Sequence, residues 1–118
     1  MGQPVVHFEI VGDDAAKLRT FYGELFDWKV GEPAGPEMGF YALVDGDSSG
    51  LPGGIGQPEP GGGPRLTIYV QVPDLQATLD QAVAKGGQVV MPPMEIPGVV
   101  SLAMFADPAG NVVGLIKA

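Results

Sequence analysis

The sequence predicts an α+β domain built from two copies of a βαβββ module, and three observations support this. A strand pattern followed by a capped helix occurs twice, three strand candidates follow each helix, and the segment Pro58–Pro64 (PEPGGGP) separates the copies near the middle of the chain. We therefore assign residues 1–118 to a single domain. Module one covers about residues 4–57, a linker covers 58–64, and module two covers about 65–118.

Composition sets limits on the class of protein. With 118 residues, 45% hydrophobic and 17% charged, the chain has the size and the apolar content of one folded domain. A net charge of -8 with only six Lys and Arg argues against nucleic-acid binding, and no apolar run approaches the length of a membrane span. The absence of cysteine excludes disulfides and thiolate ligands. We expect a cytoplasmic protein without a nucleic-acid or membrane partner.

In module one, Val5–Val11 alternates between two faces as a strand does. Asp13 and Asp14 then offer N-cap carboxylates for a helix, whose apolar residues recur at helical spacing and predict one buried face: Leu18, Phe21, Tyr22, Leu25 and Phe26. Three strand candidates follow at Trp28–Val30, Phe40–Val44 and Leu51–Gln57. The glycines of the last candidate indicate a bulge or a close backbone approach.

Module two repeats this order. A strand over Leu66–Val72 is followed by a cap at Asp74 and by a helix that carries Leu75, Leu79, Ala82 and Val83. Lys85-Gly86-Gly87 predicts the end of that helix. Strand candidates follow at Gln88–Met91, Val99–Ala106 and Asn111–Ile116, with a loop over Pro92–Pro97 and a turn over Asp107–Gly110.

Aligning the modules by their cap residues pairs Asp14 with Asp74. In that register His7 corresponds to Thr67, Glu9 to Tyr69 and Val11 to Gln71. Two adjacent βα units also arise by chance in many α+β domains. The three strands predicted after each helix favour a duplication over chance.

Particular segments of the chain resemble the vicinal-oxygen-chelate superfamily, which includes glyoxalases, bleomycin-resistance proteins and extradiol dioxygenases. They are His7–Ile10, Asp13-Asp14, Phe21–Trp28, Val72–Leu75 and Phe105–Asn111. The resemblance implies that the two modules form an incomplete, curled mixed β-barrel with the helices outside and a cleft inside. It also implies a homodimer, with the cleft between modules of one chain or of two chains.

Metal-dependent members of the superfamily take four ligands from the first and last strands of the two modules. His7 matches one of these positions, but its counterpart Thr67 is neither an imidazole nor a carboxylate. The last strand of module two has Gly114 at the ligand position, and the end of module one offers only the amide of Gln57. Because metal sites need three or four suitable ligands, we predict no tightly bound metal and no cofactor.

The cleft face implied by the resemblance carries the candidate site residues. His7 and Glu9 share one face of the first strand, where a carboxylate next to an imidazole could form an acid/base pair. Equally, His7 could simply be hydrogen-bonded to a neighbouring strand, and Glu9 could be solvated. The candidate ligand-binding residues are Trp28, Tyr41, Gln57, Thr67, Tyr69, Gln71 and Met104.

Three functions are compatible with these residues. The leading hypothesis is a metal-free protein of this superfamily that binds a small organic molecule in the cleft between modules. The alternative is a glyoxalase-related lyase or isomerase that uses Glu9 or His7 as general base. A third is a structural domain whose cleft has no ligand.

Overall fold

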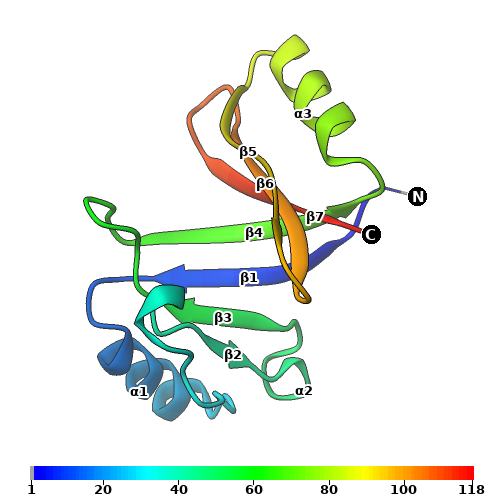
Figure 1. Ribbon diagram of the computed structural model, residues 1–118. Coiled ribbons are helices and arrows are strands. Elements are labelled where there is room, and N and C mark those ends of the chain that lie inside the picture. The colour runs from blue at the N-terminus through cyan, green and yellow to red at the C-terminus, as the bar shows by residue number, and fades with distance from the viewer. Residues whose placement is uncertain (1) are drawn as a thin grey trace. The chain divides into compact units, whose positions relative to one another are not determined.

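The computed structural model describes residues 2–118 and divides them into two compact units. One unit is His7–Leu66, and the other contains Thr67–Ala118 together with Val5 and Val6. The elements of both units are labelled in Figure 1. No helix in residues 2–118 is long and apolar enough to cross a membrane.

Module one is a small mixed sheet with a helix packed against it. Its elements are β1 (Val5–Val11), α1 (Ala15–Phe26), the 3-10 helix η1 (Pro36–Met38), β2 (Ala42–Val44), the short helix α2 (Gly46–Ser49) and β3 (Gly53–Gly56). The strand order is β2-β3-β1, because β3 runs parallel to β1 and antiparallel to β2. An isolated bridge from Val30 to Val44 extends the sheet beyond β2.

Module two has the same topology with longer strands. Its elements are β4 (Arg65–Val72), α3 (Leu75–Ala84), β5 (Gln88–Ile96), β6 (Val100–Ala106) and β7 (Val112–Lys117). The order is β4-β7-β6-β5, with β7 parallel to β4 and antiparallel to β6. Each first strand therefore pairs in parallel with the last strand of its module, and the predicted duplication is confirmed.

The caps and cores follow from the predicted patterns. The carboxylates of Asp14 and Asp74 accept hydrogen bonds from the N–H groups of Lys17 and Ala77, so both caps are confirmed. In module one, Ile10, Val44 and Ile55 form a buried cluster. In module two the buried cluster lies between α3 and the sheet, where α3 runs beside β5 and β6 (Figure 1), and consists of Val72, Leu75, Leu79, Ala103 and Leu115.

The predicted buried face of α1 is wrong in part. Leu18 and Tyr22 pack against the core cluster, but three apolar side chains of the helix are more than half exposed: Phe21, Leu25 and Phe26. The reason is the small size of the sheet beneath the helix. Its inner strand β3 has four residues, three of which are glycines, and it offers room for only a narrow stripe of the helix.

Three predicted boundaries also differ. The strand predicted at Trp28–Val30 is reduced to the bridge at Val30, since Gly31 and Pro33 interrupt the extended chain. Phe40 precedes β2 in a turn with φ 52°. The loop predicted from Pro92 is instead the continuation of β5 to Ile96, because β5 is an edge strand, where a proline without an N–H can be accommodated.

Candidate functional site

His7 and Tyr41 form a hydrogen-bonded pair in module one. The Nε2 atom of His7 lies 2.8 Å from the Tyr41 hydroxyl, and the two rings are nearly parallel, with 21° between their planes. Burial lowers the pKa of His7 below its ordinary value, against the opposing effect of the Glu9 carboxylate. At neutral pH the imidazole is therefore uncharged and able to accept a proton.

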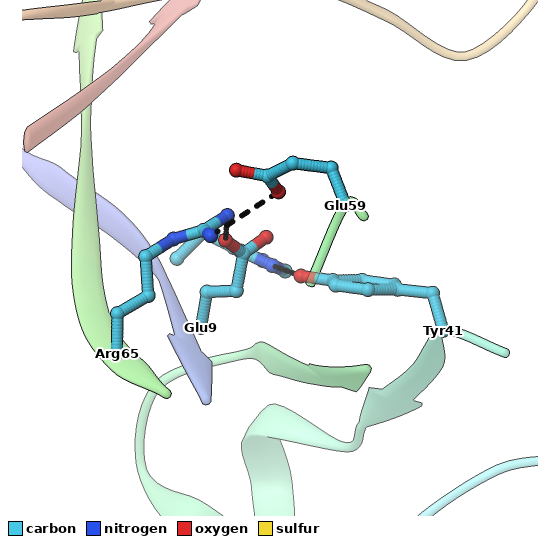
Figure 2. A network of polar contacts seen from close by, with 5 residues as sticks. Glu9, Tyr41, Glu59 and Arg65 are labelled. Atoms are coloured by element: carbon cyan, nitrogen blue, oxygen red, sulfur yellow. Dashed lines mark hydrogen bonds and ion pairs between the residues drawn. The ribbon is translucent and has the colours of Figure 1, made fainter. Parts of the chain in front are cut away.

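Glu9 lies on the same face of β1 as His7 and belongs to a group of charged side chains linked by ion pairs, which we call the ionised group. Its Oε1 atom lies 3.2 Å from Nη2 of Arg65, and Nη1 of that arginine lies 3.5 Å from Oε2 of Glu59. The guanidinium lies between the two carboxylates, with the Tyr41 hydroxyl pointing toward the same group (Figure 2). The Glu9 side chain is 10% exposed, whereas that of Glu59 is 70% exposed, so the inner ion pair is the shielded one.

Two glycines of β3 lie beneath the Tyr41 ring. In the parallel ladder Gly54 pairs with Glu9 and Gly56 with Val11, so these glycines share the face that carries His7 and Glu9. A Cβ atom at Gly54 would overlap the Tyr41 ring, and one at Gly56 would come within 2.8 Å of it. Glycine is required at these positions because aromatic rings occupy the space of a side chain: Tyr41 at Gly54 and Gly56, and Phe8 at Gly53 on the other face.

Module two has a similar arrangement with uncharged residues. Gly114 of β7 pairs with Tyr69 of β4 and with Met104 of β6, and a Cβ atom at Gly114 would overlap the Tyr69 ring. Thr67 and Gln71 lie two residues to either side of Tyr69 and share its face by strand alternation. The Thr67 hydroxyl is buried with no hydrogen-bond partner in residues 2–118.

These contacts do not fit the metal site implied by the superfamily. The register makes Gly54, and not Gln57, the counterpart of Gly114, because each of these glycines pairs with the residue five positions before its module's cap. Side chains at both positions are absent, and tyrosine rings fill the space where they would project. In the described part of the chain, no three His, Asp or Glu side chains are grouped so that they could hold an ion.

The remaining predicted residues divide between two faces. Tyr41 lies with His7, and Thr67, Tyr69, Gln71 and Met104 share a face of module two. Trp28 lies on the opposite face of β1, where its ring packs against Phe8 and Tyr22 at centroid distances of 5.4 and 5.7 Å, so it is a core residue of module one. Gln57 follows the end of β3, and its backbone N–H donates to Gly39.

Two residues of the ionised group were absent from the sequence-based candidates. Arg65 stands at the first position of β4, and Glu59 belongs to the segment predicted as a linker. Alternation places Arg65 on the face of Thr67 and Tyr69, which was a usable signal. Nothing in the sequence indicates that Glu59 lies next to it, since the path of a Pro/Gly-rich loop follows no period.

A cavity of about 640 Å³ opens beside His7 in module one. Lys29 and Asp45 are the charged residues of its wall. The rest of the wall consists of glycine backbone and of apolar side chains, namely Val30, Leu43, Val44 and Pro52. This volume is in the range that small organic ligands occupy. Of the residues predicted for the site, His7 alone lines this cavity.

Comparison with known proteins identifies relatives of the whole fold. Residues 5–115 match the family model of the Glyoxalase/Bleomycin resistance protein/Dioxygenase superfamily. The chain is 33% identical over 110 residues to the Mycobacterium tuberculosis protein named "Putative glyoxylase CFP32", and the match covers 89% of this chain and 42% of that protein. It is 29% identical over 117 residues to the anthracycline biosynthesis protein DnrV of Streptomyces peucetius, with coverage of 87% and 42%. The chain thus spans about two fifths of the length of these relatives.

Solved structures agree with the fold. The Bacillus halodurans protein BH1468 superposes with a TM-score of 0.75 at 13% identity, covering 100% of this chain and 96% of that one. Methylmalonyl-CoA epimerase from Mycobacterium tuberculosis gives a TM-score of 0.69 at 16% identity, covering 96% and 86%. These likenesses confirm the predicted fold class. From the duplicated βαβββ topology, the matching strand registers and the family model, the chain belongs to the Glyoxalase/Bleomycin resistance protein/Dioxygenase superfamily.

Proposed function

We propose that this domain binds a small organic molecule next to His7, without a resident metal. The observation that carries the proposal is the cavity of about 640 Å³ that has His7 in its wall. Apolar side chains there can bury the body of a ligand, while a few polar groups orient it. A domain with a similar sequence in a protein named for anthracycline biosynthesis makes aromatic polyketides reasonable ligands to test.

The polar groups extend from the cavity along β1. Glu9 lies two residues beyond His7, a distance of roughly 7 Å along an extended strand. A ligand in the cavity could therefore reach the Tyr41 hydroxyl and the ion pair of Arg65 as well. Because Tyr41 lies on a glycine backbone and is hydrogen-bonded to His7, its ring is held in position before any ligand arrives.

A second function, a lyase or isomerase, is supported by the protonation state of His7. Burial favours the neutral imidazole, which is the form that a general base requires. The Tyr41 hydroxyl lies within hydrogen-bond distance of the His7 Nε2 atom. Glu9 is less suited to this role since Arg65 already compensates its charge. If the domain is an enzyme, His7 is the residue from which proton transfer would start.

Ligand binding can be followed through His7 itself, because it is the single histidine of the sequence. The untagged protein is titrated with daunorubicin, bleomycin and S-hexylglutathione, and the imidazole resonances are recorded by NMR together with the melting temperature. A ligand bound next to His7 shifts its resonances in a saturable way and raises the melting temperature.

The test variant is His7→Gln, and its matched control is Leu66→Gln. The first substitution removes the imidazole from the cavity wall and should weaken binding, whereas the second changes a side chain that is 75% exposed and lies outside the wall. The proposal fails if ligands raise the melting temperature equally in both variants with no change at His7 in the unsubstituted protein. Turnover of a bound compound that is lost in His7→Gln would favour the enzyme.

A further inference from the structure

We propose that Arg65 is the binding site for a carboxylate group of the ligand, and that Glu59 occupies this site until the ligand displaces it. The inference rests on the proposed function and names its ligand class, an organic acid. Its starting point is the asymmetry of the two ion pairs around one guanidinium group.

The inner pair joins side chains of two regular strands. Glu9 belongs to β1 and Arg65 to β4, and both side chains are largely shielded from solvent, with exposed fractions of 10% and 29%. A shielded carboxylate needs a positively charged partner, so Glu9 holds Nη2 of the arginine in place. The guanidinium thus has a fixed position and a fixed orientation.

The outer pair has the opposite character. The Nη1–Oε2 distance of 3.5 Å is longer than the 3.2 Å of the inner pair, and the Glu59 side chain is 70% exposed. Glu59 also precedes three consecutive glycines, Gly61–Gly63, in a segment without regular structure. An exposed pair of this kind contributes at most about 1 kcal/mol, so a competing carboxylate can replace it.

The guanidinium retains unused capacity for such a competitor. Arg65 has five N–H donors, and the two carboxylates each take one of its terminal nitrogens without forming a bidentate pair. Its Nε atom is buried with no hydrogen-bond partner in residues 2–118. Exchange of the Glu59 carboxylate for that of a ligand leaves the local charge unchanged, so the replacement does not require burial of an additional charge.

This assignment limits the ligand to an acid with an organic body. The carboxylate would pair with Nη1 of Arg65, and the body would extend along β1 toward Tyr41 and His7, which lie on the same face as Glu9. Glu59 then acts as an internal competitor that lowers the affinity for every acid. A neutral analogue forms no ion pair with Arg65, so it does not compete with Glu59 for the guanidinium.

The test compares benzoate with its neutral analogue benzamide. NMR of the untagged full chain follows the Nε–H resonances of the two arginines, Arg19 and Arg65, which Arg65→Lys assigns. We expect benzoate at millimolar concentration to shift the Arg65 resonance in a saturable way and benzamide to leave it unchanged. Glu59→Gln should tighten benzoate binding by up to about fivefold, and Arg65→Gln should abolish it.

Glu24→Gln is the matched control, because it removes the same charge from an exposed position of α1. The inference is overturned if the two glutamate variants change the benzoate affinity equally, or if benzoate leaves Arg65 unshifted. If benzoate and benzamide shift His7 alike while Arg65 is unaffected, organic ligands bind but acids are not selected. In that case the proposed function stands and the carboxylate site is wrong.

Discussion

The two modules have one topology and different surfaces. In both, the first strand pairs in parallel with the last, and a glycine of the last strand lies beneath a tyrosine ring. The unit His7–Leu66 carries the imidazole, the buried carboxylate and the guanidinium, while the face of module two that corresponds to His7 and Glu9 carries Thr67, Tyr69 and Gln71. Strand pairing depends on the backbone and tolerates this divergence. Module one therefore concentrates the ionisable groups from which chemistry or recognition could arise.

The modules also differ in the way they are stabilised. Module two has strands of six to nine residues and a core cluster of five buried residues under α3. Module one has strands of three and four residues beside β1, a smaller cluster, and an α1 whose outer aromatic residues are exposed. The module with the ionised group is thus the one with less apolar packing. Four substitution experiments test this contrast, in order of decreasing expected change in stability.

The largest effect is expected from the core of module two. Leu79 is 1% exposed, and Leu79→Ala should lower the free energy of unfolding by about 2–5 kcal/mol because it leaves a cavity. Urea denaturation followed by circular dichroism measures this value. Val83→Ala is the control on the same helix, where a side chain that is 51% exposed should change the stability by no more than about 0.5 kcal/mol. Equal effects of the two substitutions would mean that α3 is packed differently.

The tyrosine-covered glycines should respond alike in both modules. Gly54→Ala and Gly114→Ala each place a methyl group where a tyrosine ring lies, and each should cost about 1–3 kcal/mol in urea denaturation. The cost of Gly54→Ala should shrink in a Tyr41→Ala background, which shows that the ring is its cause. Gly63→Ala is the control, since its Cβ atom would meet open space. A cost of Gly54→Ala that is independent of Tyr41 would contradict this explanation.

The two helix caps should be of equal value. Asp14→Ala and Asp74→Ala each remove a carboxylate that accepts a hydrogen bond from a backbone N–H in the first turn. Each should lower the free energy of unfolding by about 0.5–2 kcal/mol. Asp13→Ala removes the same charge next to Asp14 without removing a cap, and should have a smaller effect. If Asp13→Ala proved as costly as Asp14→Ala, the effect would come from charge and not from capping.

The smallest effect concerns the pH dependence of module one. The native pKa of His7 is lowered, so between its ordinary pKa of 6.5 and that lower value the unfolded chain binds more protons than the native protein. The contribution of His7 is fully present above pH 6.5 and decreases as the pH falls toward the native pKa. Melting temperatures of the unsubstituted protein should thus decrease more steeply on acidification than those of His7→Gln. Parallel curves for the two proteins would show that His7 is not shielded in solution.

Much of the fold was predictable because strands and helices impose local periods on the sequence. Alternation predicted Val5–Val11 and Leu66–Val72 to within one residue of β1 and β4, and the cap aspartates predicted both helix starts. The continuation of β5 through Pro92 and Pro93 was missed because edge position, which makes proline tolerable, is a property of the sheet. The exposure of Phe21 and Phe26 was missed for a related reason, since the helical spacing gives a face but not the area available to cover it.

The amino-acid sequence was sufficient to predict the duplicated order of elements, the positions of the caps and the placement of His7 and Glu9 on one face of a strand. These depend on neighbours within a few residues, where the backbone geometry is regular. Three contacts follow from the folded chain alone: Tyr41 lies on Gly54, Arg65 pairs with Glu9, and Glu59 lies beside that arginine. Such contacts join residues that are 6 to 56 positions apart. Irregular loops bring them together, and no repeating pattern in the sequence encodes the path of those loops.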